Sequence, residues 1–333
     1  MTLTLDQLDE AISVANKHIR KEIISQLETT NYLYNCLTTK GKTYISGGTK
    51  IQQPIIFKEN ESQGFIDGKF DVINTNTNQQ ITYAIWPWKY YGRAVNITMD
   101  EIVKTHNTSE AVKSLLIAKK QAAVASSIRD LSRAMHGSGT DNNGKSFNGF
   151  ADIFSASGIP YGGISNEDIP EWITIRDSSS SEPNYPTISK MISKLNARAN
   201  QYGGGMKNGF RPDIIISNNA VQNAFMSTLQ AQQRFIDKSK LQAGFQGVDV
   251  NGLFWYVDEF ANGSADGTAD NHIYVISSNT FKFFYKYGLG KKSPFDQEIQ
   301  LPNQTIKSDQ AFIAGNIGCV SRRLNGVFTS IIA

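Results

Sequence analysis

Two adjacent arginines near the carboxyl end are the first candidates for chemistry. Arg322 and Arg323 stand in the segment 321–330, SRRLNGVFTS, directly before a turn-like Leu-Asn-Gly. Two guanidinium groups could hold a phosphate or a carboxylate through paired hydrogen bonds. If the segment is a strand, neighbouring side chains point to opposite faces of the sheet. At most one of the two could then be buried in an ion pair, so we expect strand residues rather than an anion clamp.

The densest group of aromatic residues lies at 86–93, in the sequence WPWKYYGR. Its rings alternate with Lys89 and Arg93, and such a pattern could stack on nucleic-acid bases or on sugars. We favour a different interpretation, in which the rings anchor a strand to the body of the protein, because aromatic side chains dominate buried contact area. Pro87 predicts an edge strand here, since proline cannot donate a hydrogen bond to a sheet ladder.

Residue types that hold metals or cofactors are present without the spacing that such sites need. The four histidines and two cysteines share no ligand pattern, so neither a zinc site nor a disulfide framework is predicted. The segment 285–292 resembles a phosphate-binding loop only at its Gly-Lys pair, and both ends of the pattern fail. The sequence therefore predicts no enzyme, with no catalytic residue, no metal and no cofactor.

The composition favours long loops and sheet surfaces over a compact helical enzyme. Charged residues make up 19% of the chain, and the net charge is +3. That charge is too small for a protein whose affinity depends on neutralising many phosphates. No segment approaches the ~18 apolar residues of a membrane span, and the first residues lack the pattern of a signal peptide. With only two cysteines, we expect a soluble protein in a reducing compartment.

The pattern of the first hundred residues predicts two projecting elements, a helix and a hairpin. Apolar residues recur at steps of three and four over 1–30, among them Leu8, Ile12 and Ile19, and this predicts an amphipathic helix. Its apolar stripe must be covered by the same domain or by a partner chain. Strand periodicity from 43 to 99 then predicts a long hairpin with few apolar residues in its middle. Such a hairpin is marginal alone and becomes reasonable as an arm that packs on a neighbouring molecule.

The rest of the chain predicts a mixed α+β layout. A helical period over 109–136 indicates one helix about 40 Å long. A buried strand is expected at 211–217, followed by a helix that Asn218 or Asn219 could cap. Short strands then continue to the carboxyl end, and no internal repeat is present.

The order of these blocks, more than any single motif, resembles the major capsid proteins of tailed bacteriophages, which have the Hong Kong 97-type fold. The resemblance covers nearly the whole chain: an amino-terminal arm, a long two-stranded extended loop, a long spine helix and an α/β region that holds RPDIIISNNAVQNAF. The family has no short invariant signature. The division that the resemblance implies is an amino-terminal arm at 1–42, an extended loop at 43–99, a peripheral domain with the spine helix at 100–164, an axial domain at 165–296 and return strands of the peripheral domain at 297–333.

The resemblance also implies a function. The chain would be a structural protein that assembles with copies of itself into hexamers and pentamers of an icosahedral shell around weakly held double-stranded DNA. Its location would be the virion capsid, after assembly in the cytoplasm of a host bacterium, and its further partners a separate scaffolding protein, a portal and a maturation protease, with no membrane. Candidate contacts between subunits are Leu8, Ile12, Ile19, Lys69, Trp86, Trp88, Arg322 and Arg323.

Three alternatives stay open at this point. An encapsulin-like compartment shares the fold and encloses enzymes instead of a genome. A β-rich phage tail, baseplate or glycan-binding protein gains support only from the aromatic cluster and from the many Asn, Ser and Thr residues. An enzyme would need a pocket with perturbed titratable groups, which the sequence does not show.

Overall fold

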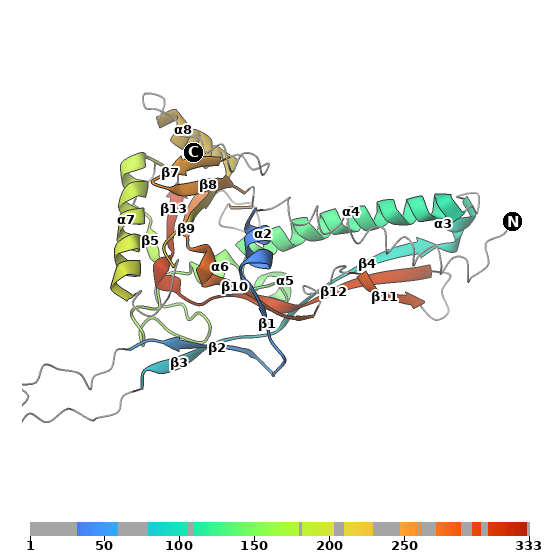
Figure 1. Ribbon diagram of the computed structural model, residues 1–333, viewed down its shortest axis with the longest axis horizontal. Helices are drawn as coiled ribbons and strands as arrows, with labels where there is room; N and C mark the ends of the chain where they lie inside the picture. Colours follow the sequence, from blue (N-terminus) through green and yellow to red (C-terminus); the bar gives the residue numbers. More distant parts are fainter. Residues whose placement is uncertain are drawn as a thin grey trace, which may run out of the picture.

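The computed structural model of the chain contains two β-sheets that meet in one core, a separate two-stranded hairpin and one long helix (Figure 1). This mixture of helices and sheets is the α+β class that the sequence predicts. The structure describes residues 32–58, 79–104, 109–179, 182–202, 210–228, 247–258, 260–261, 271–287, 295–300 and 306–331.

The predictions for the amino-terminal helix and for the tip of the extended loop lie outside these described residues. Leu8, Ile12 and Ile19 precede residue 32, and Lys69 falls between residues 58 and 79. Their assignment as contacts between subunits stays a prediction.

The five-stranded sheet is organised around its longest strand, β12. Strands β4 and β11 both pair with residues 307–311 of β12, so they lie on its two opposite sides. Strand β10 is antiparallel to β12, and the short β1 joins β10 in parallel. The strands of this sheet are β1 (Lys42–Tyr44), β4 (Lys89–Thr98), β10 (Phe281–Tyr287), β11 (Phe295–Gln300) and β12 (Ile306–Cys319).

The predicted long helix is confirmed as α4, which spans Ser109–His136. It runs along β4 and β12 in Figure 1. Its Val124 and Ile128 pack on Val95 of β4 and Ala311 of β12 in a small apolar cluster. One helix therefore covers one face of a narrow ribbon of strands. Shorter helical segments of the chain are α3 (Met99–Lys104), α5 (Asp141–Gly144) and η2 (Ser278–Thr280).

The second sheet has six strands in the order β5-β13-β9-β6-β8-β7. The predicted buried strand near residue 214 is confirmed as β6, whose four residues are all buried. Strand β6 lies inside the sheet, parallel to β8 and antiparallel to β9. The strands are β5 (Ile175–Asp177), β6 (Ile214–Ser217), β7 (Gly247–Val250), β8 (Leu253–Val257), β9 (Asn271–Ile276) and β13 (Gly326–Ile331).

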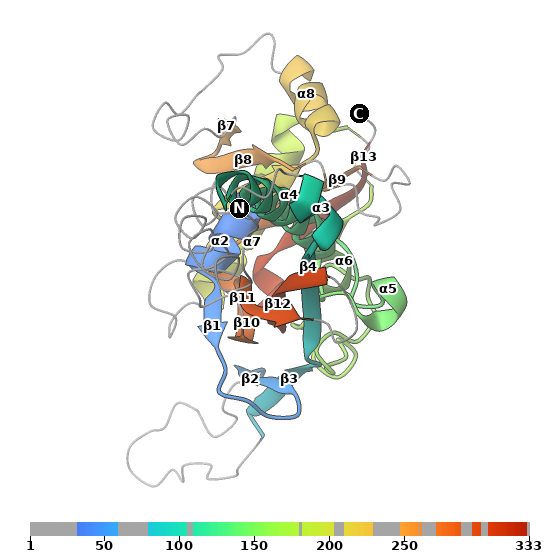
Figure 2. The ribbon, with the colours of Figure 1, turned by 90° about the vertical axis from the view of Figure 1, so that its right-hand side faces the viewer.

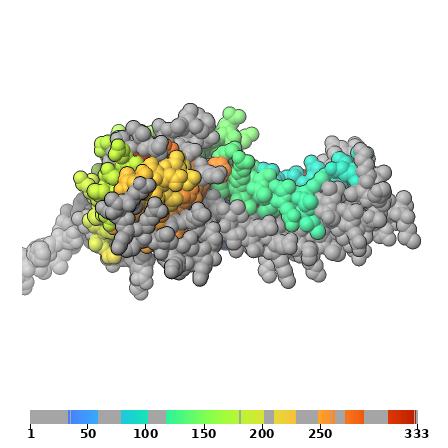
Figure 3. Space-filling model, turned by 90° about the horizontal axis from the view of Figure 1, so that it is seen from above, coloured from blue at the N-terminus to red at the C-terminus, as the bar shows by residue number. Residues whose placement is uncertain are grey.

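Alternate residues of the six-stranded sheet face two different layers. Ile215, Trp255 and Val275 pack against α7 (Tyr185–Tyr202) and α8 (Asn219–Thr228). Figure 3 shows these two helices on the rounded body of the molecule, from which α4 extends. This face therefore forms a core of its own.

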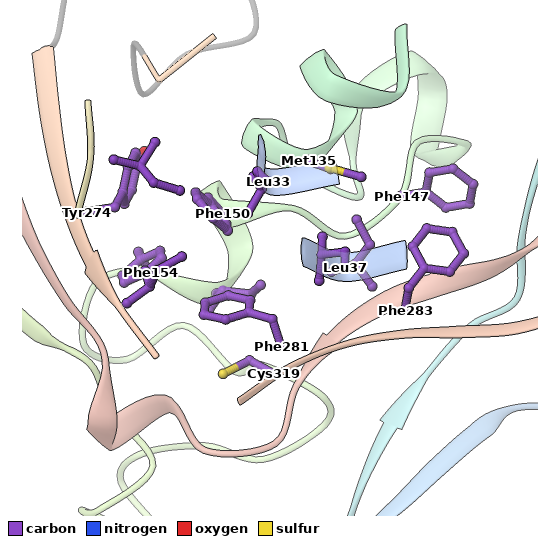
Figure 4. Close-up of a cluster of buried hydrophobic side chains, with 14 of the residues drawn as sticks. Leu33, Leu37, Met135, Phe147, Phe150, Phe154, Tyr274, Phe281, Phe283 and Cys319 are labelled. Atoms are coloured by element: carbon purple, nitrogen blue, oxygen red, sulfur yellow. The ribbon is translucent and has the colours of Figure 1, made fainter. Parts of the chain in front are cut away.

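The opposite face of the same sheet packs into the largest core, together with the five-stranded sheet. Ile214 and Tyr274 enter this core from the six-stranded sheet, beside α2 (Tyr32–Thr39), α6 (Phe150–Ile153) and the last turn of α4. Aromatic rings fill much of the space where these elements meet (Figure 4). Further side chains in this core are Leu33, Leu37, Met135, Phe147, Phe154, Phe281, Phe283 and Cys319.

The predicted cap at the start of α8 is confirmed for Asn218. Its side-chain Oδ1 accepts a hydrogen bond of 2.9 Å from the amide of Val221. We expect Asn218→Ala to lower the free energy of unfolding by about 1 kcal/mol, because the amide loses its acceptor. Asn218→Asp keeps an acceptor and should lose less. Urea denaturation of the two variants checks this, and equal losses would contradict a capping role.

The structure divides the strands differently from the expected domain boundaries. Strand β4 pairs along ten residues with β12, so among the described residues the hairpin consists only of β2 (Ile51–Ile56) and β3 (Ile81–Trp86). Strand β10 joins the five-stranded sheet, while β13 joins the six-stranded sheet. The boundary expected near residue 297 therefore does not separate the sheets, because pairing partners lie far apart in the sequence.

The expectation that Arg322 and Arg323 belong to a strand is wrong. They form a short 3-10 helix, η3 (Arg322–Leu324), between β12 and β13. The side-chain amide of Asn325 closes this turn by donating to the carbonyl of Ser321 at 2.8 Å. The turn lets the chain pass from one sheet to the other.

Candidate functional site

Trp86 anchors the hairpin to the body of the protein. Its side chain is 1% exposed and stacks on Phe284 with ring centres 5.5 Å apart. The ring of Tyr161 lies against it at 5.9 Å. Glycine at position 318 allows this close approach, because a Cβ added there would lie 3.1 Å from the indole and 2.8 Å from the ring of Phe284. The anchoring interpretation of the aromatic cluster is therefore confirmed for Trp86, whose buried ring is closed to a neighbouring subunit.

Two hydrogen bonds hold the base of the hairpin further. The amide of Ile85 donates to the carbonyl of Gly162 at 2.8 Å, which ties β3 to a loop of the body. The indole Nε1 of Trp88 donates to the carbonyl of Gly48 at 2.8 Å. Trp88 is partly buried against the large core. The two tryptophans therefore set the direction in which the hairpin leaves the body, and a contact of Trp88 with a second subunit stays a prediction.

The hairpin has one covered and one open face. In its register Ile51 pairs with Trp86, and both are buried. On the other face Ile56 pairs with Ile81, at 77% and 52% exposure, and the next pair is Pro54 with Tyr83, whose exposure is 55%.

We call Pro54, Ile56, Ile81 and Tyr83 the outer hairpin face. The hairpin sheet contains only β2 and β3 among the described residues. Contiguous exposed apolar groups of this kind mark interaction sites. These residues were not predicted from the sequence, although in β3 Ile81 and Tyr83 alternate with the polar Thr82, a pattern that indicates one apolar face.

Arg322 is a structural residue rather than a ligand clamp. It is 1% exposed, and its Nε donates to the carbonyl of Ile153 at 2.8 Å. Its Nη1 donates to the carbonyl of Trp172 at 3.2 Å, and Nη2 reaches Ser155 Oγ at 3.0 Å. Burial lowers the pKa of its guanidinium, which also lies 5.1 Å over the ring of Tyr161. These contacts join three segments of one chain and leave no surface for a second subunit.

Arg323 points into a different environment. It is partly buried, and its carbonyl accepts a 3.3 Å hydrogen bond from Nη1 of Arg198 on α7. Burial, and then the positive charge of Arg323, lower the pKa of Arg198. The side chains of Arg322 and Arg323 therefore do not converge on one anion. A role of Arg323 near a contact between subunits stays a prediction.

The thiol of Cys319 is buried and therefore not accessible as a reactive group. Burial raises the pKa of this thiol to about 11. Burial also raises the pKa of Tyr161, whose hydroxyl accepts a 2.9 Å hydrogen bond from the amide of Cys319. A thiol that stays protonated at neutral pH is a poor nucleophile. This pair holds the end of β12 in place.

Ion pairs attach α4 to strands β4 and β12 and to the short helix α3 that follows β4. Lys120 and Asp309 form a buried pair, and Arg93 pairs with Asp130 at the surface. Lys119 pairs with Glu101 at 2.6 Å, and the hydrogen bond from this lysine lowers the pKa of the Glu101 carboxyl. Breaking a buried pair is costly even where forming it adds little stability. These pairs therefore determine where along the ribbon the helix lies.

His136 connects the end of α4 with the six-stranded sheet. Its Nε2 lies 3.0 Å from Oδ2 of Asp258, just after β8, and its ring packs edge-on against Phe150. Over the described part of the chain, no group of three or more His, Cys, Asp or Glu residues is arranged to hold a metal ion. Within that same part, no helix has the length and apolar character needed to cross a membrane.

Comparison with known proteins shows similarity in structure alone. The sequence matches no protein-family model and no curated protein. A chain of the cyanophage A-1(L) capsid asymmetric unit has a TM-score of 0.57 at 16% identity, over 89% of this chain and 91% of that one. The holo-SrpI encapsulin complex of Synechococcus elongatus PCC 7942 scores 0.53 at 9% identity, covering 91% and 89% of the two chains.

A third solved structure agrees with these two. A chain from the capsid of a native GTA particle has a TM-score of 0.53 at 8% identity and covers 88% of each chain. At such identities the likeness concerns the fold. It extends over nearly the whole chain, since 88–91% of its residues are covered in the three comparisons. The chain has the Hong Kong 97-type fold of tailed-phage major capsid proteins.

Proposed function

We propose that this chain is the major capsid protein of a tailed bacteriophage. Copies of it would form hexamers and pentamers that close into an icosahedral shell around double-stranded DNA. A scaffolding protein, a portal and a maturation protease would assist assembly in the host bacterium. The virion capsid would then be its final location.

The observation that carries this proposal is the outer hairpin face on a chain with a capsid fold. Its apolar side chains point into solvent from the β2–β3 hairpin, which is anchored at its base by Trp86. Burying one such side chain against another molecule contributes roughly 1.5–3 kcal/mol. A contact between this face and a different surface of a second copy is heterologous, and heterologous contacts generate rings.

A second exposed apolar group offers a surface for such contacts. Tyr90 of β4 and Phe312 of β12 stack with ring centres 5.8 Å apart and are 61% and 43% exposed. They lie on the ribbon face away from α4, because Tyr91 and Arg93 reach Asp130 of the helix from the other face. The two apolar groups support assembly from copies of a single chain.

A double substitution on the outer hairpin face tests the proposal. We expect Ile81→Ser with Tyr83→Ser to abolish shells seen by electron microscopy while leaving the chain folded, because both side chains are already exposed. Ile159→Ser is the control, since Ile159 is equally exposed, at 53%, but lies in a loop outside the hairpin. Shells from the double variant as abundant as those of the unaltered chain would contradict the proposal.

An encapsulin-like compartment is the second candidate, because the SrpI encapsulin shares the fold at a similar TM-score. The two functions differ in cargo rather than in the shell. Purified shells from cells that also express the neighbouring genes should contain nuclease-protected DNA if the chain is a phage capsid protein. Shells that contain one enriched enzyme and no protected DNA would favour the compartment.

A further inference from the structure

Strand β4 has one edge without a partner strand among the described residues, since it pairs only with β12. At the end of β4 near Thr98, hydrogen bonds show which backbone N–H and C=O groups point away from β12. The amide of Thr98 donates to Glu101 at 3.1 Å, and the carbonyl of Asn96 accepts from Lys119 at 3.0 Å. Because these groups alternate in an antiparallel strand, every even-numbered residue of β4 points its N–H and C=O away from β12.

The open part of this edge is short and has defined ends. At one end, Glu101 accepts from the outward amide of Thr98, and Lys119 donates to the outward carbonyl of Asn96. At the other end, the side chain of Lys89 donates to the carbonyl of Gly139 at 3.0 Å. Between them the outward groups of Tyr90, Gly92 and Ala94 have no hydrogen bond within the described part of the chain. All three residues are exposed. Edge strands of soluble proteins are commonly blocked by charges, prolines or bulges. The segment 90–94 contains no proline and no bulge in its pairing with β12, and its one charged side chain, Arg93, is directed to Asp130 on the helix side.

We propose that two copies of this chain join through this edge, antiparallel to each other, with Gly92 facing Gly92 across a two-fold axis. An antiparallel edge is its own complement, so the contact is isologous. Tyr90 of each copy would face Ala94 of the other, and the three pairs would exchange roughly six hydrogen bonds. The inference rests on the proposed function, because it adds a two-fold contact to the ring-forming contacts of a shell.

Charges on the helix side of the ribbon are complementary in this arrangement. Arg93 of one copy would lie opposite Tyr91 of the other, at the distance of a cross-strand pair. The hydroxyl of Tyr91 is already 3.2 Å from Oδ2 of Asp130, which is 43% exposed. Each copy therefore brings a guanidinium close to the carboxylate of its partner.

Within the part of the chain that the structure describes, the side chains on both faces of the ribbon are compatible with the pairing. The two α4 helices would lie side by side on one face. Ala122 and Ser126 are exposed and follow Lys119 at steps of three and seven residues, so they lie toward the flank of α4 from which Lys119 and Asp130 contact β4. Small residues allow helices to approach closely. On the other face, the ring of Tyr90 could cover Ala94 of the partner, a cross-strand pair typical of sheets.

Two substitutions of Gly92 distinguish the effect of losing its backbone amide from the effect of adding a side chain. A Cβ at Gly92 would meet only Ala311 O and a ring carbon of Phe312, both at 3.9 Å, so Gly92→Ala fits the single chain. Gly92→Pro removes the outward amide and is tolerated where that amide faces solvent. We expect Gly92→Pro to weaken the two-fold contact roughly tenfold or more, as measured by sedimentation of the full chain, and Gly92→Ala to leave it within about threefold.

Cross-linking tests the register directly. In a Cys36→Ser background, Gly92→Cys would place two Cα atoms about 5.5 Å apart in the pair, within the range that a disulfide spans. Ala94→Cys is the matched control, because it faces Tyr90, and its two copies would lie roughly 14 Å apart. Mild oxidation of assembled shells should therefore give covalent dimers for Gly92→Cys and not for Ala94→Cys.

The outcomes distinguish the two proposals. Shells that form without a Gly92→Cys dimer, and that are unaffected by Gly92→Pro, would overturn the two-fold edge while leaving the capsid function intact. Dimers from Ala94→Cys but not from Gly92→Cys would also overturn the stated register. An unaltered chain that forms no shells under any condition would instead contradict the capsid function.

Discussion

Replacing Arg322 with methionine should lower the free energy of unfolding by roughly 3–5 kcal/mol. Methionine fills much of the space but donates no hydrogen bond. The carbonyls of Ile153, Trp172 and Ser155 would then be buried without their donors, and each unsatisfied group costs about 1–3 kcal/mol. Denaturant unfolding followed by fluorescence measures the loss, and Trp172 itself provides a local signal.

Arg322→Lys tests whether the hydrogen-bond geometry of Arg322, rather than its charge alone, stabilises the fold. Lysine keeps the charge but has one nitrogen, so it cannot donate to all three carbonyls in the geometry of a guanidinium fork. We expect it to recover less than half of the loss. Arg129→Ala is the control, because Arg129 is exposed on α4 and its removal should change stability by less than about 0.5 kcal/mol. Equal effects of Arg322→Met and Arg129→Ala would show that Arg322 does not hold the fold together.

Trp86→Ala should cost roughly 3–5 kcal/mol, the range for removing a large buried ring. The indole fills the space between Phe284 and Tyr161, so its loss leaves a cavity where the hairpin joins the body. Because the hairpin is held mainly at this base, we also expect faster amide exchange in β2 and β3. Thermal unfolding and hydrogen exchange of the full chain measure the two effects.

Trp88→Phe is the control for Trp86→Ala. It removes the hydrogen bond to Gly48 but keeps an aromatic ring, so a loss of about 1 kcal/mol is expected. A shell defect in Trp86→Ala without a change in stability would mean that the ring acts at an interface instead. That result would restore the original prediction of Trp86 as a contact between subunits.

Several elements could be predicted from the sequence because their signals are local. The period of α4 and the cap at Asn218 involve residues within a few positions of one another. The buried strand β6 is a continuous apolar run. The roles of Arg322 and Arg323 could not be predicted, since the partners of Arg322 lie 150–169 positions away and that of Arg323 lies 125 positions away, and only folding brings them together.

By itself, the sequence determined the class of elements and their order along the chain, because periodicity, caps and turn residues act over short distances. That order was sufficient for the resemblance to a capsid protein. Only the tertiary structure decided that β4 leaves the hairpin to pair with β12, that β13 crosses to the other sheet, and that Trp86 is an anchor. It also decided which apolar residues stay exposed on the hairpin. Burial and long-range strand pairing depend on which segments meet in space, and no local pattern encodes that.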